Sequence, residues 1–397
     1  MILRGGYRDP AGSIERPHLD VATRPDHPAP QALAQRPWRI GLIVAVLAVT
    51  ISGCQRLPHL QQLFERHVAG PSLEGTYRLI YDGAKGTANG QPSRVESDKV
   101  LWAFRSTCTK SNGCTATATA LDRNDAKTEY RPAFTMVLHF SYGQWISMPS
   151  SVAVMHMGPC RGGGDTVVSQ APVATSEAMQ LKPEADGTLT GNLSATVLSN
   201  VCGGQGLVAD VPFTATRIGD VASTVNVADP DSAGPRPPKT STLSSAFNGL
   251  YSLQANTLAR TRNGFQAPTP LPYPSAWAMR AVCNTSTHCI ATGALFNSFG
   301  SMPTVVLESV GEKWQTAAST IRAVPCSFGP LSTTVVIEMQ VEMDNAGYSG
   351  IGTETIRVLT GECGDQGATY NTPVTLRKAG IFPPSAVVAD PDLFMPS

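Results

Sequence analysis

The sequence lacks a net charge and is poor in charged residues of either sign. Lys and Arg together number 30, Asp and Glu also number 30, and charged residues make up only 15% of the 397 positions. A nucleic-acid-binding protein usually carries a basic patch that attracts phosphates. Because the composition provides no basic excess, we expect no nucleic-acid partner.

The short motifs of common enzymes are also missing. A nucleophile elbow (G-x-S-x-G), a zinc helix (H-E-x-x-H) and a phosphate loop (G-x-x-x-x-G-K-[ST]) are all absent from the sequence. After residue 71, histidine occurs only as His139, His156 and His288, and no nucleophile or carboxylate partner can be assigned to any of them. We therefore predict no catalytic residue, no metal, no cofactor and no enzymatic activity. Paired carboxylates far apart in the sequence would escape this search, so a hydrolase with a scattered site is the least favoured alternative.

Near the N-terminus the one apolar run is short. Residues 40–51 (I-G-L-I-V-A-V-L-A-V-T-I) are uncharged and follow Arg36 and Arg39. A membrane-spanning helix needs about 20 apolar residues, whereas the core of a signal peptide takes about 7–15. The run leads into I-S-G-C, which resembles the bacterial lipobox, so Cys54 is predicted to be the lipidated N-terminal residue of the mature protein. An uncleaved signal anchor with an incidental Cys54 is the alternative.

Both alternatives place the rest of the chain outside the cytoplasm, because the arginines before the apolar run stay inside. Residues 1–39 are then a disordered tail, or the product of a start codon placed too early. Residues 40–54 are the signal or anchor segment, and residues 55–71 are a juxtamembrane stalk. We expect the protein on the extracytoplasmic side of the cell membrane, attached by the lipid or by the anchor.

The remaining cysteines reveal an internal duplication. They form two sets of four, with offsets of 175, 175, 166 and 161 residues between equivalents: Cys108, Cys114, Cys160 and Cys202, then Cys283, Cys289, Cys326 and Cys363. Other phrases keep the same order, such as W-A-F-R and W-A-M-R, C-G-G-Q-G and C-G-D-Q-G, and two copies of V-A-D-P-D. A unit of about 160 residues is therefore repeated. We predict two homologous domains, 72–226 and 247–392, joined by a Pro- and Ser-rich linker at 227–246.

Within each unit the local patterns are those of strands. V-L-W-A-F-R-S-T-C and C-T-A-T-A-T-A-L alternate large and small residues, and L-K-P-E-A-D-G-T-L-T-G-N-L has Asp186-Gly187 at a hairpin turn. No long stretch inside either unit has a convincing helical period. We predict an all-β fold with two tandem antiparallel domains, each of about six to eight strands that close, or nearly close, as a barrel or sandwich.

Duplicated cysteine pairs in an exported protein indicate disulfides. Four cysteines allow three pairings in each unit. The short spacing around a turn favours one bond that staples a hairpin in each unit and one that closes a longer loop: Cys108–Cys114, Cys283–Cys289, Cys160–Cys202 and Cys326–Cys363. His156 and His288 lie near cysteines, but neither recurs in the other unit, which disfavours a metal site.

The Trp and Arg residues shared by the two units are the candidate ligand contacts. Strand alternation puts Trp102 on one face of its strand and Arg105 on the other, and Trp277 and Arg280 repeat the arrangement. An aromatic wall with a cationic contact would suit an anionic or glycan ligand. The alternative, which we favour, is a Trp in the core behind the hairpin disulfide and an Arg in an ion pair on the outer face.

Several phrases resemble a module of mycobacterial exported and membrane-anchored proteins: G-T-Y-R-L at 75–79, W-A-F-R-S-T-C at 102–108, D-G-T-L-T-G at 186–191 and P-F-T-A-T-R at 212–217. Some members of that family carry the module alone or in tandem, and others attach it outside the membrane to a cytoplasmic Ser/Thr kinase. The resemblance covers about residues 72–232 well and 247–392 more loosely. It implies a cell-envelope location and sensing or binding, and it implies no catalytic residue. We expect no kinase domain in this chain.

These observations favour an envelope-tethered, extracytoplasmic binding or sensor-like protein, with an envelope ligand or protein partner that the sequence does not identify. The alternative is a structural spacer that makes protein–protein contacts in the cell envelope. Exposed apolar surface shared by both units would favour the spacer.

Overall fold

The computed structural model describes residues 72–395, apart from 94, 96, 110–112, 132, 156–159, 162–166, 170–172, 201–203, 235–240, 245, 270–273, 286–287, 297–303, 317–319, 326–331, 345 and 360–363. The tail, the signal or anchor segment with Cys54, and the stalk lie outside these residues. Cys202, Cys326, Cys363 and the side chain of Cys160 lie outside them as well. Predictions for those positions stay predictions. In the described part of the chain, no helix has the length and apolar character needed to cross a membrane.

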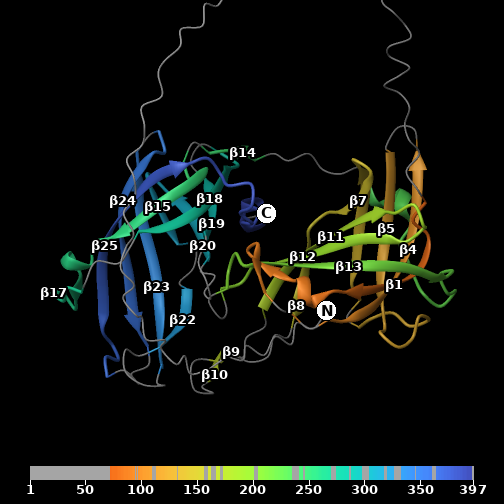
Figure 1. Cartoon of the computed structure of the whole chain (residues 1–397), viewed down its shortest axis with the longest axis horizontal. Helices are drawn as coiled ribbons and strands as arrows, with labels where there is room; N and C mark the ends of the chain where they lie inside the picture. The colour runs from red at the N-terminus through yellow and green to blue at the C-terminus, as the bar shows by residue number, and fades with distance from the viewer. Residues whose placement is uncertain are drawn as a thin grey trace, which may run out of the picture. The chain divides into compact units, whose positions relative to one another are not determined.

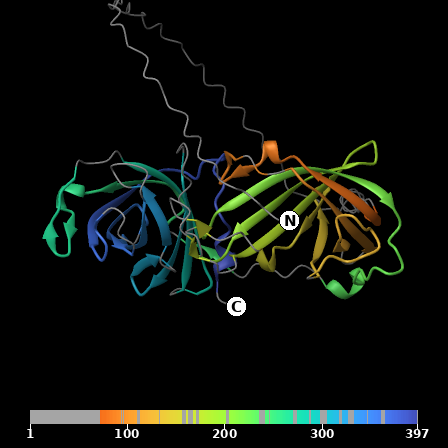
Figure 2. The same cartoon turned by 90° about the horizontal axis from the view of Figure 1, so that it is seen from below.

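The first unit is a closed antiparallel barrel (Figures 1 and 2). Each strand pairs with its neighbour around the ring, and β1 pairs with β13 to close it. In chain order, the eight strands of the ring are β1 (Gly75–Tyr81), β4 (Lys99–Thr109), β5 (Gly113–Leu121), β6 (Thr135–Ser141), β7 (Gln144–Ser147), β11 (Val173–Pro183), β12 (Leu189–Val197) and β13 (Val208–Gly219).

Shorter elements accompany this barrel. The hairpin of β2 (Thr87–Ala88) and β3 (Gln91–Pro92) pairs with β13, and β8 (Ser150–Met155) pairs with β11. A separate two-stranded ribbon consists of β9 (Cys160–Arg161) and β10 (Val167–Ser169). Two 3-10 turns complete the described elements of the unit, η1 (Gly83–Lys85) and η3 (Pro230–Ala233).

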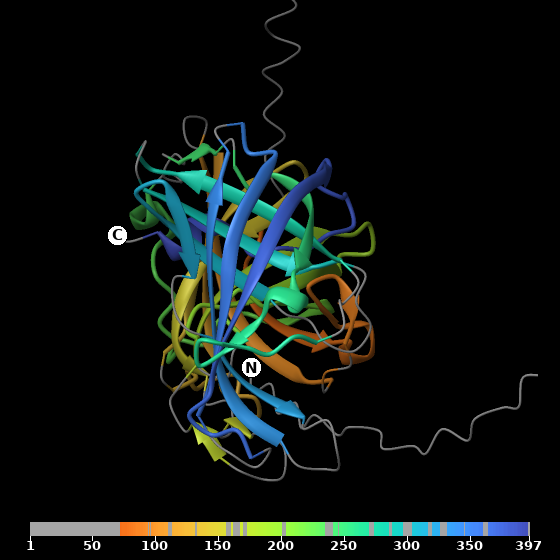
Figure 3. The ribbon, with the colours of Figure 1, turned by 90° about the vertical axis from the view of Figure 1, so that its left-hand side faces the viewer.

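The second unit repeats the same ring, closed by the pairing of β15 with β25. Its eight strands are β15 (Gly249–Ala255), β18 (Ser275–Cys283), β19 (Cys289–Leu295), β20 (Thr304–Val310), β21 (Lys313–Thr316), β23 (Ser332–Met343), β24 (Ser349–Val358) and β25 (Thr369–Gly380). The long strands β23, β24 and β25 face the viewer in Figure 3. The accompanying elements are β14 (Thr242–Leu243), β16 (Thr261–Arg262), β17 (Phe265–Gln266), β22 (Thr320–Pro325), η4 (Thr257–Ala259) and η5 (Pro391–Phe394). The predicted all-β class with two tandem antiparallel domains is confirmed.

The alternating sequence of each strand sets the core of each barrel. On β4, Trp102 and Phe104 point into the barrel, where they face the small side chains of β5. Large and small residues on paired strands fill the interior without colliding. Trp145 on β7 and Trp314 on β21 are both buried in their cores, so the duplicated tryptophans serve packing in both units.

A glycine opens the first strand of each barrel for a steric reason. Gly75 and Gly249 have φ angles of +109° and +140°, which side chains other than glycine rarely adopt. A Cβ on Gly75 would lie 2.6 Å from the carbonyl oxygen of Gly219, and one on Gly249 would lie 2.5 Å from that of Gly380. The pairing that closes each ring shifts register directly after these glycines. The repeated Gly-x-Tyr phrase therefore marks the closure point.

The repeated V-A-D-P-D segment covers the outside of its own barrel. Val227 is buried in a cluster with Leu101 and Ala103, the residues of β4 that point outward. The Thr117 hydroxyl donates a hydrogen bond of 2.5 Å to the carbonyl oxygen of Ala228. In the second unit, the hydroxyl of Thr292 donates in the same way to Ala389 O, at 2.6 Å. The start of the predicted linker thus packs against the first barrel, and the domain boundaries remain a prediction.

Candidate functional site

Trp102 lies inside the first barrel and lines a cavity there. Its side chain is 4% exposed, and its ring meets the Phe134 ring edge to face, with 5.3 Å between centroids. The centre of a water-sized sphere can occupy about 40 Å³ of the cavity, and the whole space between the lining atoms, out to solvent, is about 430 Å³. Besides Trp102, the lining includes three more aromatic residues, an aliphatic residue and an acid: Tyr81, Tyr130, Phe134, Leu193 and Glu177.

Glu177 is the unusual member of this lining. It lies on β11, in the phase of the strand that faces the core, and only 3% of its surface is exposed. No described residue donates a hydrogen bond to its carboxyl group or pairs with it as a cation. Burial raises the pKa of Glu177 above its ordinary value of 4.5, because the ionised form loses its hydration.

Tyr81 lines the same cavity and is buried as well. Burial raises the pKa of its hydroxyl well above 10, and the Glu177 carboxylate raises it further. The hydroxyl therefore stays protonated and can donate a hydrogen bond into the cavity. A proton donor and a buried acid thus stand together in a mainly apolar chamber.

The only cation in the cavity lining, among the residues described, is already paired. The Arg123 guanidinium binds both carboxylate oxygens of Asp98, with N–O distances of 3.1 and 2.8 Å. This two-point geometry is the strongest arrangement available to the pair. Since Asp98 neutralises Arg123, the ionised Glu177 would leave the cavity with a net negative charge.

Arg105 lies on the opposite face of β4, in an outer groove of about 390 Å³. The groove also contains Arg217, which pairs with Asp220 and donates a hydrogen bond of 3.0 Å to Glu74 O. Because Trp102 points into the barrel and Arg105 points out of it, the two side chains cannot contact one ligand together. The groove and the cavity are separate features.

The equivalent Trp and Arg residues of the second unit have different surroundings. Trp277 is half-buried and donates a hydrogen bond of 3.0 Å from Nε1 to Ser275 Oγ. Arg280 lies over the ring of Phe382, 5.2 Å from its centroid. A cation over an aromatic face is satisfied without a carboxylate. The structure therefore shows the four Trp and Arg side chains in four distinct environments.

Register identifies the interior residues that correspond between the barrels. Leu181 pairs with Trp145 in the first barrel, and Val341 pairs with Trp314 in the second. Four residues earlier on the same strands stand Glu177 and Ile337. On the first strands, Tyr77 pairs with Trp102 and Tyr251 pairs with Trp277, so Tyr77 and Tyr251 are equivalent. Four residues later on these strands, Tyr81 corresponds to Ala255. A half-buried acid of the second barrel, Glu354, occupies the position of Leu193.

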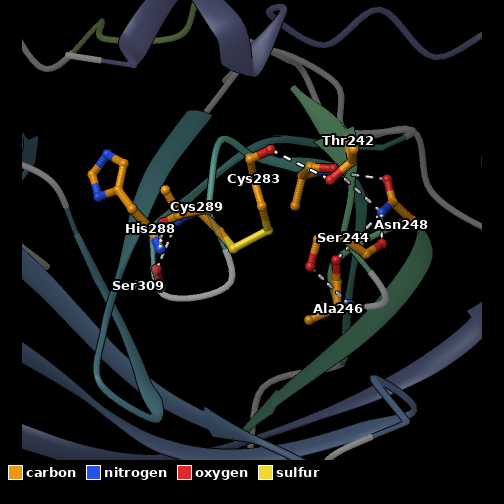
Figure 4. The surroundings of a disulfide bond; sticks show 10 residues. Thr242, Ser244, Ala246, Asn248, Cys283, His288, Cys289 and Ser309 are labelled. Atoms are coloured by element: carbon orange, nitrogen blue, oxygen red, sulfur yellow. Dashed lines mark hydrogen bonds between the residues drawn. A yellow bond between two sulfur atoms is a disulfide. The ribbon is translucent and has the colours of Figure 1, made fainter. Parts of the chain in front are cut away.

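Each barrel contains one described disulfide, across the hairpin of β4 and β5 or of β18 and β19. The bonds join Cys108 to Cys114 and Cys283 to Cys289, with 4.0 Å between Cα atoms in both. Figure 4 shows the second bond: the Cys289 amide donates to Ser309 Oγ at 2.8 Å, and the ring of His288 points away from the sulfur atoms. No cluster of metal-ligating side chains occurs within the described ranges.

Comparison with known proteins identifies the family of this chain. A family model for the PknI serine/threonine-protein kinase sensor domain matches the chain twice, at residues 70–232 and 244–393. The chain belongs to this family. The resemblance predicted from the sequence is confirmed, and the homology supports an extracytoplasmic sensor-like module in each unit.

Curated relatives share part of this chain. The serine/threonine-protein kinase PknI of Mycobacterium tuberculosis and that of Mycobacterium bovis are each 38% identical to it over 174 residues. The matched region is 43% of this chain and 28% of the kinase, so the chain covers less than a third of those relatives.

Solved structures of the M. tuberculosis PknI sensor domain are also similar. The monomer form is 32% identical, with a TM-score of 0.32, and the match covers 41% of this chain and 99% of that one. The dimer form is 38% identical, with a TM-score of 0.27, and the match covers 33% and 79%.

Glu177 is the residue of this sensor module that the sequence analysis missed. The signal was present, because V-A-T-S-E-A-M-Q-L alternates, and its inward phase reads Val173, Thr175, Glu177, Met179 and Leu181. A carboxyl group in an apolar phase indicates either a partner or a functional role. The candidate contacts predicted from the sequence are residues that both units share, and Glu177 is not shared.

Proposed function

We propose that this chain is a membrane-tethered sensor-like protein of the cell envelope, in which the first barrel is the ligand-binding unit. The observation that carries the proposal is the cavity of the first barrel, which reaches solvent and contains a buried acid among aromatic side chains. Ligand sites in small barrels are typically apolar chambers with a few fixed polar groups. A sensor-family module with such a chamber fits a receptor.

Two further observations support the tether and its side of the membrane. The apolar run at 40–51 leads into I-S-G-C, which suits lipidation at Cys54 or an anchor. Both described disulfides lie in the units that follow, and disulfides persist in oxidising compartments rather than in the cytoplasm. Attachment to the membrane by either route leaves both barrels outside.

The alternatives lack a comparable observation. Among the residues that the structure describes, the exposed apolar side chains of the first unit do not recur in the second: Ile80 and Ile218 correspond to Gln254 and Ala379. A spacer with one shared contact surface would repeat them.

The outer groove gathers several carboxylates, but most of those have other partners. Asp220 pairs with Arg217, and Asp229 accepts a hydrogen bond from the Asp231 amide at 3.0 Å. A hydrolase would need two carboxylates placed around one reacting bond.

One preparation tests the proposal. The chain is purified from its own membranes, and its mass is measured by native and then by denaturing mass spectrometry. Non-reducing peptide mapping of the same sample identifies the disulfides. We expect a non-covalent small-molecule adduct in the native spectrum, and either a chain that begins at acylated Cys54 or one that retains the apolar run. Recovery of the chain from the cytosol with reduced cysteines would contradict the tether. A membrane-bound chain with no adduct would contradict ligand binding by this unit.

A further inference from the structure

The buried acid of the first barrel needs a partner that the described residues do not supply. A buried carboxylate without a partner loses its hydration and gains no interaction in return. Glu177 is 3% exposed and forms the wall of a cavity, so it is both buried and directed toward a space that a ligand can enter. Arg123, which supplies the guanidinium of the described lining, is already paired with Asp98. A cation from solution would complete the site.

The remaining lining suits a cation as well. Four aromatic residues line the cavity: Tyr81, Trp102, Tyr130 and Phe134. The face of an aromatic ring attracts a positive charge, and Trp does so most strongly. Aromatic walls with one carboxylate hold an ammonium group through both attractions, and they disfavour an anion.

The cavity has room for an ammonium group. A site that holds one water molecule needs about 10–15 Å³ of space occupied by a water-sized sphere. Here the centre of such a sphere can move through about 40 Å³, so a group of the size of an ammonium ion fits. The wider space of about 430 Å³ leaves room toward solvent for the rest of a small molecule.

We propose that the cavity of the first barrel binds the primary ammonium group of a small amine, with Glu177 as its anionic partner and Trp102 as its aromatic wall. This inference rests on the proposed sensor function and names the ligand class of the same site. The second barrel lacks this chemistry at the corresponding positions, where Ile337 and Ala255 replace Glu177 and Tyr81. Binding is therefore confined to the first barrel.

Protons compete with the amine for the site. Burial raises the pKa of Glu177, so acidic solution neutralises the carboxyl group and removes its attraction for a cation. The other titratable or charged groups around the cavity are Tyr81, Tyr130 and the Arg123–Asp98 pair. None of these provides a second free carboxylate, so affinity should rise with pH as Glu177 ionises.

Isothermal titration calorimetry of the full-length protein with butylammonium chloride tests the proposal. We expect saturable binding at pH 8 with one site per chain, and weaker binding at pH 5. Glu177→Gln should weaken it about 10- to 100-fold, the range expected for loss of a charge-assisted contact. Glu354→Gln, which removes a half-buried acid from the second barrel, is the matched control and should leave the affinity unchanged. Tetramethylammonium, which has no N–H group to donate to Glu177, should bind more weakly than butylammonium.

Several outcomes would overturn the inference. Equal binding of 1-butanol would show that the cavity recognises only the alkyl chain. Unchanged affinity in Glu177→Gln would remove the acid from the site, and the pH dependence of the wild-type protein decides the point if that variant fails to fold. Absence of saturable amine binding while the native adduct persists would reject the amine and leave the proposed sensor function standing.

Discussion

Replacement of Glu177 by Gln should stabilise the first barrel at neutral pH, in buffer free of amines. The reason is the cost of ionising a carboxyl group that is 3% exposed and has no partner among the described residues. Gln has nearly the same shape and cannot ionise. The two proteins should therefore differ only to the extent that Glu177 gives up its proton on unfolding.

The pH dependence gives the size and sign of this effect. In the unfolded chain, Glu177 titrates near 4.5, and burial raises the pKa of the folded form above that value. Below pH 4.5 the carboxyl group is protonated in both the folded and the unfolded state, and the folded protein bears no cost of ionisation at Glu177. As the pH rises from 4.5 through the folded pKa, only the folded state keeps the proton, and stability falls by up to about 1.4 kcal/mol per pH unit. Above the folded pKa the difference is constant.

Urea-dependent hydrogen exchange read by mass spectrometry separates the two barrels, because peptides of β11 report on the first and peptides of β23 on the second. The stability difference between Glu177→Gln and wild type should grow with pH in β11 and stay constant in β23. Glu312→Gln, which removes a carboxyl group from an exposed turn of the second unit, controls for general charge effects. An identical pH dependence of β11 in wild type and Glu177→Gln would refute the reasoning.

Two further predictions concern the scaffold. Replacing Cys108 and Cys114 together by Ser should lower the free energy of unfolding of the first barrel by about 2 kcal/mol, because the closed loop is short; an unchanged urea midpoint for β11 peptides would contradict this. Thr117→Val removes the hydrogen bond to Ala228 O, so the local free energy of opening at residues 225–233 should fall by about 1 kcal/mol and their amide exchange should be faster. Thr117→Ser keeps the hydroxyl and should leave the exchange unchanged. Equal exchange in both variants would contradict it.

Local patterns predicted the strands because alternation is a property of neighbouring residues. W-A-F-R-S-T-C placed Trp102 inside and Arg105 outside, and the structure shows that arrangement. Ring closure is different, because it joins Tyr77 on β1 to Arg217 on β13, far apart in the sequence. The Gly75 backbone conformation that makes closure possible was visible only as a repeated phrase. Its steric role required the carbonyl of Gly219 on the opposite strand.

The candidate site was harder to predict because the duplication marks the residues that both units share, and Glu177 is present in one unit alone. Shared positions such as Trp145 and Trp314 maintain the barrel, since both are buried in the cores. A binding function present in one unit leaves its trace where the units differ. Glu177 is such a difference, and a charged residue in the inward phase of β11 was its only local sign.

The comparison between the barrels also separates scaffold from function in energetic terms. Ile337 shows that an aliphatic side chain fits this position of the ring, and such a side chain would avoid the desolvation cost that Glu177 carries. The first barrel is therefore less stable than its own fold allows at this position. A group that lowers the stability of its domain requires a compensating interaction, and the cavity beside Glu177 is the place where a ligand can supply one. In the proposed sensor, the same carboxyl group would make folding stability and ligand occupancy interdependent.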